Sequence, residues 1–137
     1  MTSDRLARRC IAGGAALMLA AVILGAFGAH GLQSVLTPKQ LSSYVTGVTY
    51  QQLHSLGLVL IGVIACVTPP SPWLRRAAIL FLVGIALFSG SIYAMTFGAP
   101  RWLGMVAPVG GTSFMLGWAA LAAHALRARS AAAGNAS

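Results

Sequence analysis

Hydrophobic residues run along the chain in four long stretches that carry no charge. The stretches cover residues 10–38, 40–74, 77–100 and 102–126. Each exceeds the roughly 20 residues that an α-helix needs to cross the hydrocarbon core of a bilayer. We therefore predict an all-α integral membrane bundle of four transmembrane helices. Their expected limits are about 9–29, 43–67, 77–97 and 103–126.

The composition supports this pattern. Hydrophobic residues make up 58% of the chain and charged residues 7%, whereas a soluble domain has about 25% charged residues. The first helix is longer than the roughly 7–15-residue apolar core of a cleaved signal peptide, so we expect it to be retained. Residues 1–126 are expected to form a single membrane domain. A tail rich in Ser, Ala, Gly and Asn, residues 127–137, is expected to be disordered.

The basic residues predict the orientation in the membrane. The net charge is +8, but the arginines flank hydrophobic segments and do not form a basic stripe with interleaved aromatics, so nucleic acid is not an expected partner. The side of the predicted bundle that holds both termini has Arg5, Arg8, Arg9, Arg75, Arg76, Arg127 and Arg129. The opposite side has only Lys39 and Arg101. Because cytoplasmic loops carry the excess of Lys and Arg, both termini are predicted to be cytoplasmic.

The scarcity of acidic residues excludes several kinds of enzyme. Asp4 is the only carboxylate side chain, so the chain has no carboxylate pair for acid–base catalysis and no carboxylate-rich site for Mg²⁺ or Ca²⁺. Cys10 and Cys66 lack the paired spacing of a metal site. The sequence therefore predicts no catalytic residue, no metal ligand and no cofactor.

Two alternatives use the histidines. A haem could take His30 and His54 as axial ligands, although the chain has no haem-attachment motif. A serine–histidine dyad could pair His54 with Ser89, Ser91 or Ser113. Serines in membrane helices commonly serve packing and hydrogen bonding instead, so we do not expect an enzyme.

Polar residues gather in the outer halves of the helices, away from the predicted cytoplasmic side. The candidate polar cluster consists of His30, Tyr50, Gln51, His54, Ser89, Ser91, Tyr93 and Thr112. Tyr50 and Gln51 lie four and three residues before His54 and share a broad face of one helix. We expect this face to point into the bundle, where the cluster forms internal hydrogen bonds or, alternatively, lines a pocket for a small molecule, lipid headgroup or ion.

Small residues indicate where helices approach closely. Ala21, Gly25 and Ala29 recur every four residues along one predicted face, and small residues allow close backbone contact in membranes. The predicted helix-packing positions are Ala21, Gly25, Gly28, Gly90, Gly110 and Gly111. Such surfaces also allow a homo-oligomer or a membrane-protein partner.

Four motifs occur in a characteristic order. They are GAFGAHGL at 25–32, YQQLHSLGLVL at 50–60, GIALFSGSIY at 84–93, and a run at 104–121 that contains APVGGTSF and GW. Together they resemble the domain of unknown function 423 family, which includes transmembrane protein 256-like proteins. The resemblance covers residues 13–122 and implies a multi-pass helical protein of bacterial inner membranes, with eukaryotic relatives and no established biochemical activity.

The sequence thus favours a non-enzymatic structural or accessory membrane protein in contact with the lipid bilayer. The alternative is a small transporter or ligand-binding subunit with a polar pocket in the outer half of the bundle. Its lining would come from His30, Gln51, His54, Ser89, Tyr93 and Thr112.

Overall fold

The computed structural model describes the backbone of residues 3–134 and the side chains of residues 4–127. This part of the chain is helical and contains no strand. Its elements are α1 (Ser3–His30), α2 (Pro38–Val67), α3 (Pro72–Gly84), the π-helical turn η1 (Ile85–Ser89), α4 (Gly90–Thr96), the 3₁₀ turn η2 (Arg101–Met105) and α5 (Val106–Gly134).

These elements make four helical spans that are long and apolar enough to cross a membrane, as predicted. The spans are Asp4–His30, Pro38–Val67, Pro72–Thr96 and Arg101–Arg127. The third span is continuous through α3, η1 and α4. The predicted fold class, a four-helix membrane bundle, is confirmed.

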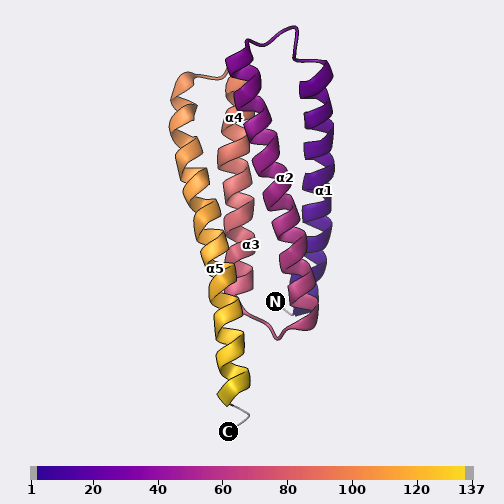
Figure 1. Ribbon diagram of the computed structural model, residues 1–137, viewed down its shortest axis with the longest axis vertical. Coiled ribbons are helices and arrows are strands. Elements are labelled where there is room, and N and C mark those ends of the chain that lie inside the picture. The colour runs from indigo at the N-terminus through magenta and orange to yellow at the C-terminus, as the bar shows by residue number, and fades with distance from the viewer. Residues whose placement is uncertain (1–2, 135–137) are drawn as a thin grey trace.

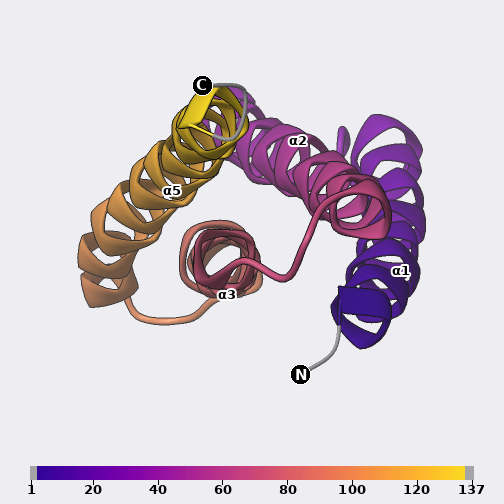
Figure 2. The same cartoon turned by 90° about the horizontal axis from the view of Figure 1, so that it is seen from below.

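The helices run up and down along one long axis (Figure 1). The start of α1, the α2–α3 connection and the end of α5 lie at the same end of the bundle, which we call the terminal face. Seen along the axis, α5, α2 and α1 form an arc, and α3 lies on its inner side (Figure 2). α1 packs mainly against α2, whereas α3 packs against both α5 and α2. The start of α1 and the end of α5 therefore share one face, and the assignment of that face to the cytoplasm stays a prediction.

Two helices begin earlier than predicted because prolines start them. Thr37 and Gln40 form a capping box ahead of α2: the backbone N–H of Gln40 donates to Oγ1 of Thr37, and the backbone N–H of Thr37 donates to Oε1 of Gln40 at 3.0 Å. Pro38 then occupies the first helical position, where its missing N–H costs nothing. Ser71 caps α3 ahead of Pro72 in a similar way. α2 therefore begins at Pro38, ahead of the predicted start at residue 43.

The last helix also extends further than predicted. α5 continues to Gly134, past the expected end at residue 126. The alanines in this region favour the helix. Residues 135–137 lie outside the described residues, and the division into a membrane domain and a separate tail stays a prediction.

The centre of the bundle forms around Phe81, whose side chain is fully buried. A Cβ atom placed on Gly57 of α2 or on Gly117 of α5 would come within 2.7 and 2.6 Å of the Phe81 ring. The two glycines therefore form a slot in which this ring packs between α2 and α5. A smaller buried cluster lies toward the opposite end of the bundle and consists of Leu32, Tyr44 and Val48.

Candidate functional site

Gln51 of α2 links three helices through one buried amide. Its Nε2 group donates to the backbone carbonyl of Leu17 in α1 at 2.9 Å. Its Oε1 atom accepts a hydrogen bond from the Tyr93 hydroxyl of α4, also at 2.9 Å. Both ends of the amide therefore have partners within the chain.

His54, one turn further along α2, is 4% exposed and also has both polar atoms engaged. Nδ1 lies 2.7 Å from the backbone carbonyl of Tyr50, and the indole N–H of Trp118 in α5 donates to Nε2 at 3.1 Å. A carbonyl can only accept and an indole N–H can only donate. His54 is therefore the neutral tautomer with its proton on Nδ1, and Nε2 is the acceptor.

Aromatic rings enclose the imidazole. The ring of Phe114 stacks on His54, with centroids 3.5 Å apart and planes at 11°. Phe81 meets it edge-on, with centroids 5.2 Å apart. Tyr50 packs 4.5 Å from Phe88 and 6.0 Å from Phe114 between ring centroids, and so covers the same region from outside. We call this group the histidine–aromatic cluster; its members are Tyr50, His54, Phe81, Phe88, Phe114 and Trp118.

Three further hydroxyl groups donate across helix boundaries to backbone carbonyls. Tyr44 reaches the carbonyl of Leu24 at 2.8 Å, which joins α2 to α1. The other two bonds are Ser89 to Gly47, which joins η1 to α2, and Ser113 to Leu80, which joins α5 to α3, each at 2.8 Å. The π-helical turn thus places Ser89 against α2.

The predicted polar cluster is only partly brought together. Its buried members Gln51, His54 and Ser89 contact neighbouring helices, and Tyr93 joins them through Gln51. Tyr50 is 39% exposed, but its ring lies beside His54. Ser91 is also buried, but its hydroxyl donates to Phe88 of the same span at 3.0 Å. Thr112 is exposed and donates to Pro108 of its own helix at 2.9 Å.

His30 does not reach this site. Its side chain is exposed and has no hydrogen bond to any described residue. A Cβ atom on Gly14 of α1 would lie 2.7 Å from the carbonyl oxygen of Ser55, the residue after His54. Gly14 therefore marks the level of His54 on α1. His30 lies sixteen residues beyond Gly14, which is about 24 Å further along the helix axis. His30 and His54 therefore cannot both ligate one haem iron.

The serine–histidine alternative also lacks the required geometry. Both His54 nitrogens have other partners, and the hydroxyl groups of Ser89, Ser91 and Ser113 all donate to backbone carbonyls. No dyad forms among these residues. Ser55 is different, because its fully buried hydroxyl is the only buried side-chain polar atom in the described part of the chain without a hydrogen-bond partner.

The small residues of α1 pack at a different spacing from the predicted one. Ala29, the last member of the predicted stripe, is exposed, and Gly25 makes only ordinary contact with Val48. The buried small residues instead recur every seven positions, which is the repeat of a left-handed pair of helices. They are Ala7, Gly14, Ala21 and Gly28.

The remaining predicted packing glycines differ from one another. A Cβ atom on Gly110 would collide with the backbone of Phe88, and one on Gly28 would lie 2.7 Å from the Tyr44 ring. Gly111 would meet only Phe88, at 3.9 Å, and Gly90 faces open space. Close helix contact therefore needs Gly28 and Gly110 but not the other two.

Four surface cavities formed by described residues lie away from the polar cluster. None of the four has a member of that cluster in its lining. At the terminal face, two arginines contact the Trp73 ring: the guanidinium carbons of Arg76 and Arg127 lie 4.8 and 4.7 Å from its centroid. This arrangement is typical of an aromatic anchor at the membrane–water interface.

Comparison with known proteins gives a consistent result. A family model described as "Protein of unknown function (DUF423)" matches residues 24–111. A UPF0382 membrane protein of Staphylococcus epidermidis is 40% identical over 114 residues, covering 83% of this chain and 92% of the relative. For the UPF0382 membrane protein YwdK of Bacillus subtilis the identity is 38%, over 83% and 93% of the two chains. The UPF0382 inner membrane protein YgdD of Escherichia coli is 37% identical, over 77% and 80%. No solved structure matches.

Proposed function

This chain belongs to the DUF423 family of membrane proteins, and from that premise we propose that it is a non-enzymatic structural or accessory protein. It is a multi-pass protein of the inner membrane, and its helices contact the lipid bilayer. In this proposal the polar side chains inside the bundle hold the helices together. The function would then depend on what the outer surface of the bundle contacts, and not on a reaction inside it.

The observation that carries this proposal is the internal pairing of Gln51 and His54. A ligand in the bundle would need donors or acceptors that it can reach, but both ends of the Gln51 amide and both His54 nitrogens already have partners. Displacing each bond would cost about 0.6–2 kcal/mol in a membrane protein. This pairing supports a structural role for the cluster.

The exposed surface of α1 supports an accessory role. Its membrane-facing side chains include Leu19, Val22 and Ile23, which are 63%, 54% and 61% exposed. Because α1 packs mainly against α2, much of this helix is open to lipid, to a second copy of the chain or to another membrane protein. Lipid and a helical partner are both compatible with such an apolar surface.

The second candidate function is a small transporter or ligand-binding subunit. Tyr50 favours it, because this partly exposed ring lies 5.9 Å from the His54 ring, between centroids, and covers it. A ligand could reach the imidazole by displacing Tyr50. In that case His54 would be needed for an activity and not only for stability.

Reconstitution into liposomes distinguishes the two functions. We expect liposomes that contain the protein to dissipate a proton gradient no faster than empty liposomes, and His54→Ala to lower the unfolding temperature. Thr112→Val is the matched control, because Thr112 bonds only within its own helix. Proton flux in the wild type that is lost in His54→Ala, with the unfolding temperature unchanged, would contradict the structural proposal.

A further inference from the structure

We propose that the cavity between α1 and α3 at the terminal face binds one anionic phospholipid, with its phosphate group at Arg9 and Arg75 and an acyl chain in the groove below. This inference goes beyond the proposed function and does not depend on it. It rests on the shape of the cavity, the apolar residues that line it and the two arginines on opposite walls.

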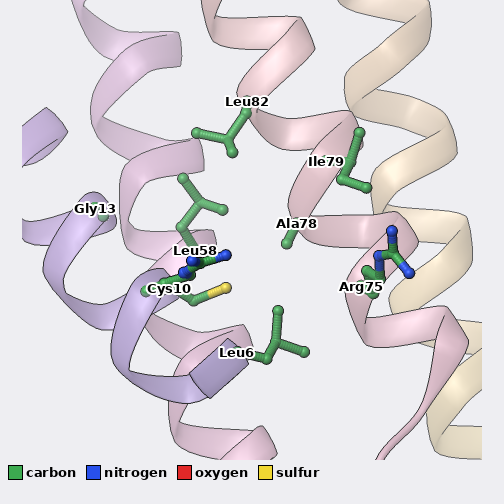
Figure 3. A pocket seen from close by; sticks show the side chains of 10 residues that line it. Leu6, Cys10, Gly13, Leu58, Arg75, Ala78, Ile79 and Leu82 are labelled. Carbon is green, nitrogen blue, oxygen red and sulfur yellow. The ribbon is translucent and has the colours of Figure 1, made fainter. Parts of the chain in front are cut away.

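The cavity has a volume of about 330 Å³ and a mostly apolar lining. Leu6 and Cys10 come from α1, Leu58 from α2, and Ala78 and Leu82 from α3 (Figure 3). α1 packs mainly against α2, whereas α3 packs against α5 and α2, and Figure 2 shows α1 and α3 on different sides of α2. Such a groove between membrane helices offers the kind of surface that an acyl chain fills.

Two neighbouring glycines on α1 face different surroundings. A Cβ atom on Gly14 would lie 2.7 Å from the Ser55 carbonyl, so this glycine serves helix contact. Gly13, which lines the cavity, would meet nothing within 4 Å. The open space beside Gly13 therefore belongs to the groove and is not filled by the protein itself.

The charge at the cavity suits a phosphate group. Arg9 and Arg75 line it from α1 and α3, and both side chains are exposed. Asp4 lines an adjacent cavity together with Arg5, Arg8 and Arg9, so basic groups outnumber the single carboxylate. Basic pockets between membrane helices are known to bind the headgroups of anionic lipids.

The depth of the groove also fits a lipid. Leu82 lies seven residues beyond Arg75, about 10 Å further from the terminal face. The groove thus reaches from the headgroup level into the hydrocarbon, a path that a free phosphate ion could not fill. A second copy of the chain would bring its own arginines to the same face, and like charges repel. An anionic phospholipid satisfies both the charge and the apolar wall.

Native mass spectrometry of the full chain tests this assignment. The purified protein is mixed with equal amounts of phosphatidylglycerol and phosphatidylcholine. We expect the wild type to retain one phosphatidylglycerol molecule in preference to phosphatidylcholine. Two variants address the two halves of the site: Gly13→Leu fills the groove, and Arg9→Gln with Arg75→Gln removes the charges. Each should weaken phosphatidylglycerol binding by roughly tenfold or more. The arginine variant loses two basic groups, each of which contributes a several-fold factor at an anionic surface. The Gly13→Leu side chain takes up the open space that the acyl chain would occupy.

Matched controls separate these effects from general damage. Gly90→Leu places the same side chain on a glycine that also faces open space but lines none of the cavities described above. Lys39→Gln with Arg101→Gln removes two charges from residues that line a different cavity. Both controls should bind phosphatidylglycerol like the wild type, and all variants should keep the wild-type helical circular dichroism spectrum.

Three results would overturn the proposal. The first is equal retention of the two lipids by the wild type. The second is unchanged phosphatidylglycerol binding in folded Gly13→Leu protein. The third is an increase in unfolding temperature with glycerol 3-phosphate equal to that with phosphatidylglycerol, which would show that a soluble phosphate group is sufficient.

Discussion

The two sides of the bundle are joined by different kinds of contact, although both use α2. α1 lies against α2 through small residues at intervals of seven, and Tyr44 and Gln51 of α2 donate to backbone carbonyls of α1. α3 and α5 meet α2 through aromatic rings, with Phe81 in a glycine slot and His54 stacked on Phe114. One side thus depends on close backbones, and the other depends on how large rings fit together.

This difference teaches where the molecule has space. The side built on rings has a buried centre, because Phe81 packs between α2 and α5, and the cavity that α3 and α5 line lies at the surface. The side built on small residues attaches α1 through one neighbour, and a groove remains beside α3. We infer that α2 is the central element and that changes on its two faces should have separable effects.

The largest effect is expected from Gly110→Val on the ring side. The new side chain would collide with the backbone of Phe88, which cannot move aside as a flexible side chain could. Overpacking of this kind costs about 3 kcal/mol. The free energy of unfolding is measured by SDS titration in bicelles. Gly111→Val is the matched control, since its nearest neighbour is 3.9 Å away, and equal losses in the two variants would contradict close packing at Gly110.

Gly14→Val tests the small-residue side. Its Cβ would approach the Ser55 carbonyl and the backbone nitrogen of Val59, so α1 would have to shift away from α2, at a cost of about 2 kcal/mol. The same titration measures the loss, and Gly13→Val should lose much less because its Cβ meets open space. If Gly13→Val were the more harmful change, the seven-residue contact between α1 and α2 would not be correct.

His54→Ala should reduce the free energy of unfolding by about 2 kcal/mol. The change removes two hydrogen bonds, each of which contributes about 0.6–1.7 kcal/mol in a membrane protein, and an aromatic stack. A double-mutant cycle with Trp118→Phe isolates the bond between the two side chains. Additive losses in the cycle would show that His54 and Trp118 are not coupled.

The smallest effect is expected from Tyr93→Phe, about 1 kcal/mol, because it removes one hydroxyl group and leaves Oε1 of Gln51 without its donor. Ser91→Ala is the control, since Ser91 bonds only to Phe88 in the same span and should change stability by less than about 0.5 kcal/mol. A Tyr93→Phe loss no greater than this control would argue against the link between α4 and Gln51.

Much of the fold follows from the sequence, because charge-free stretches of bilayer length have few alternatives. The same reasoning also placed Gln51, His54 and Ser89 on inward-facing surfaces, where the structure has them buried. The capping box at Thr37 and Gln40 was visible in the sequence, and considering it would have moved the start of α2 to Pro38.

Other features depend on contacts that a single sequence does not specify. Membrane depth alone grouped His30 with His54, but depth does not tell which face of α1 meets α2, and His30 is exposed. The seven-residue repeat of Ala7, Gly14, Ala21 and Gly28 identifies that face, whereas the four-residue spacing of Ala21, Gly25 and Ala29 does not. The slot around Phe81 could not have been found this way, since it needs glycines from two different helices.

The most direct test of the account is the protonation state of His54 in a lipid bilayer. Nitrogen-15 NMR of histidine-labelled protein, with the His54 signals assigned by their loss in His54→Ala, distinguishes the two neutral tautomers and the imidazolium. We predict a neutral ring with its proton on Nδ1 and with Nε2 accepting a hydrogen bond from Trp118, as the geometry requires. A proton on Nε2 would contradict this hydrogen-bond arrangement. A change in the protonation state of His54 when a solute is added to the wild-type protein would show that the site is open, and would contradict a purely structural role.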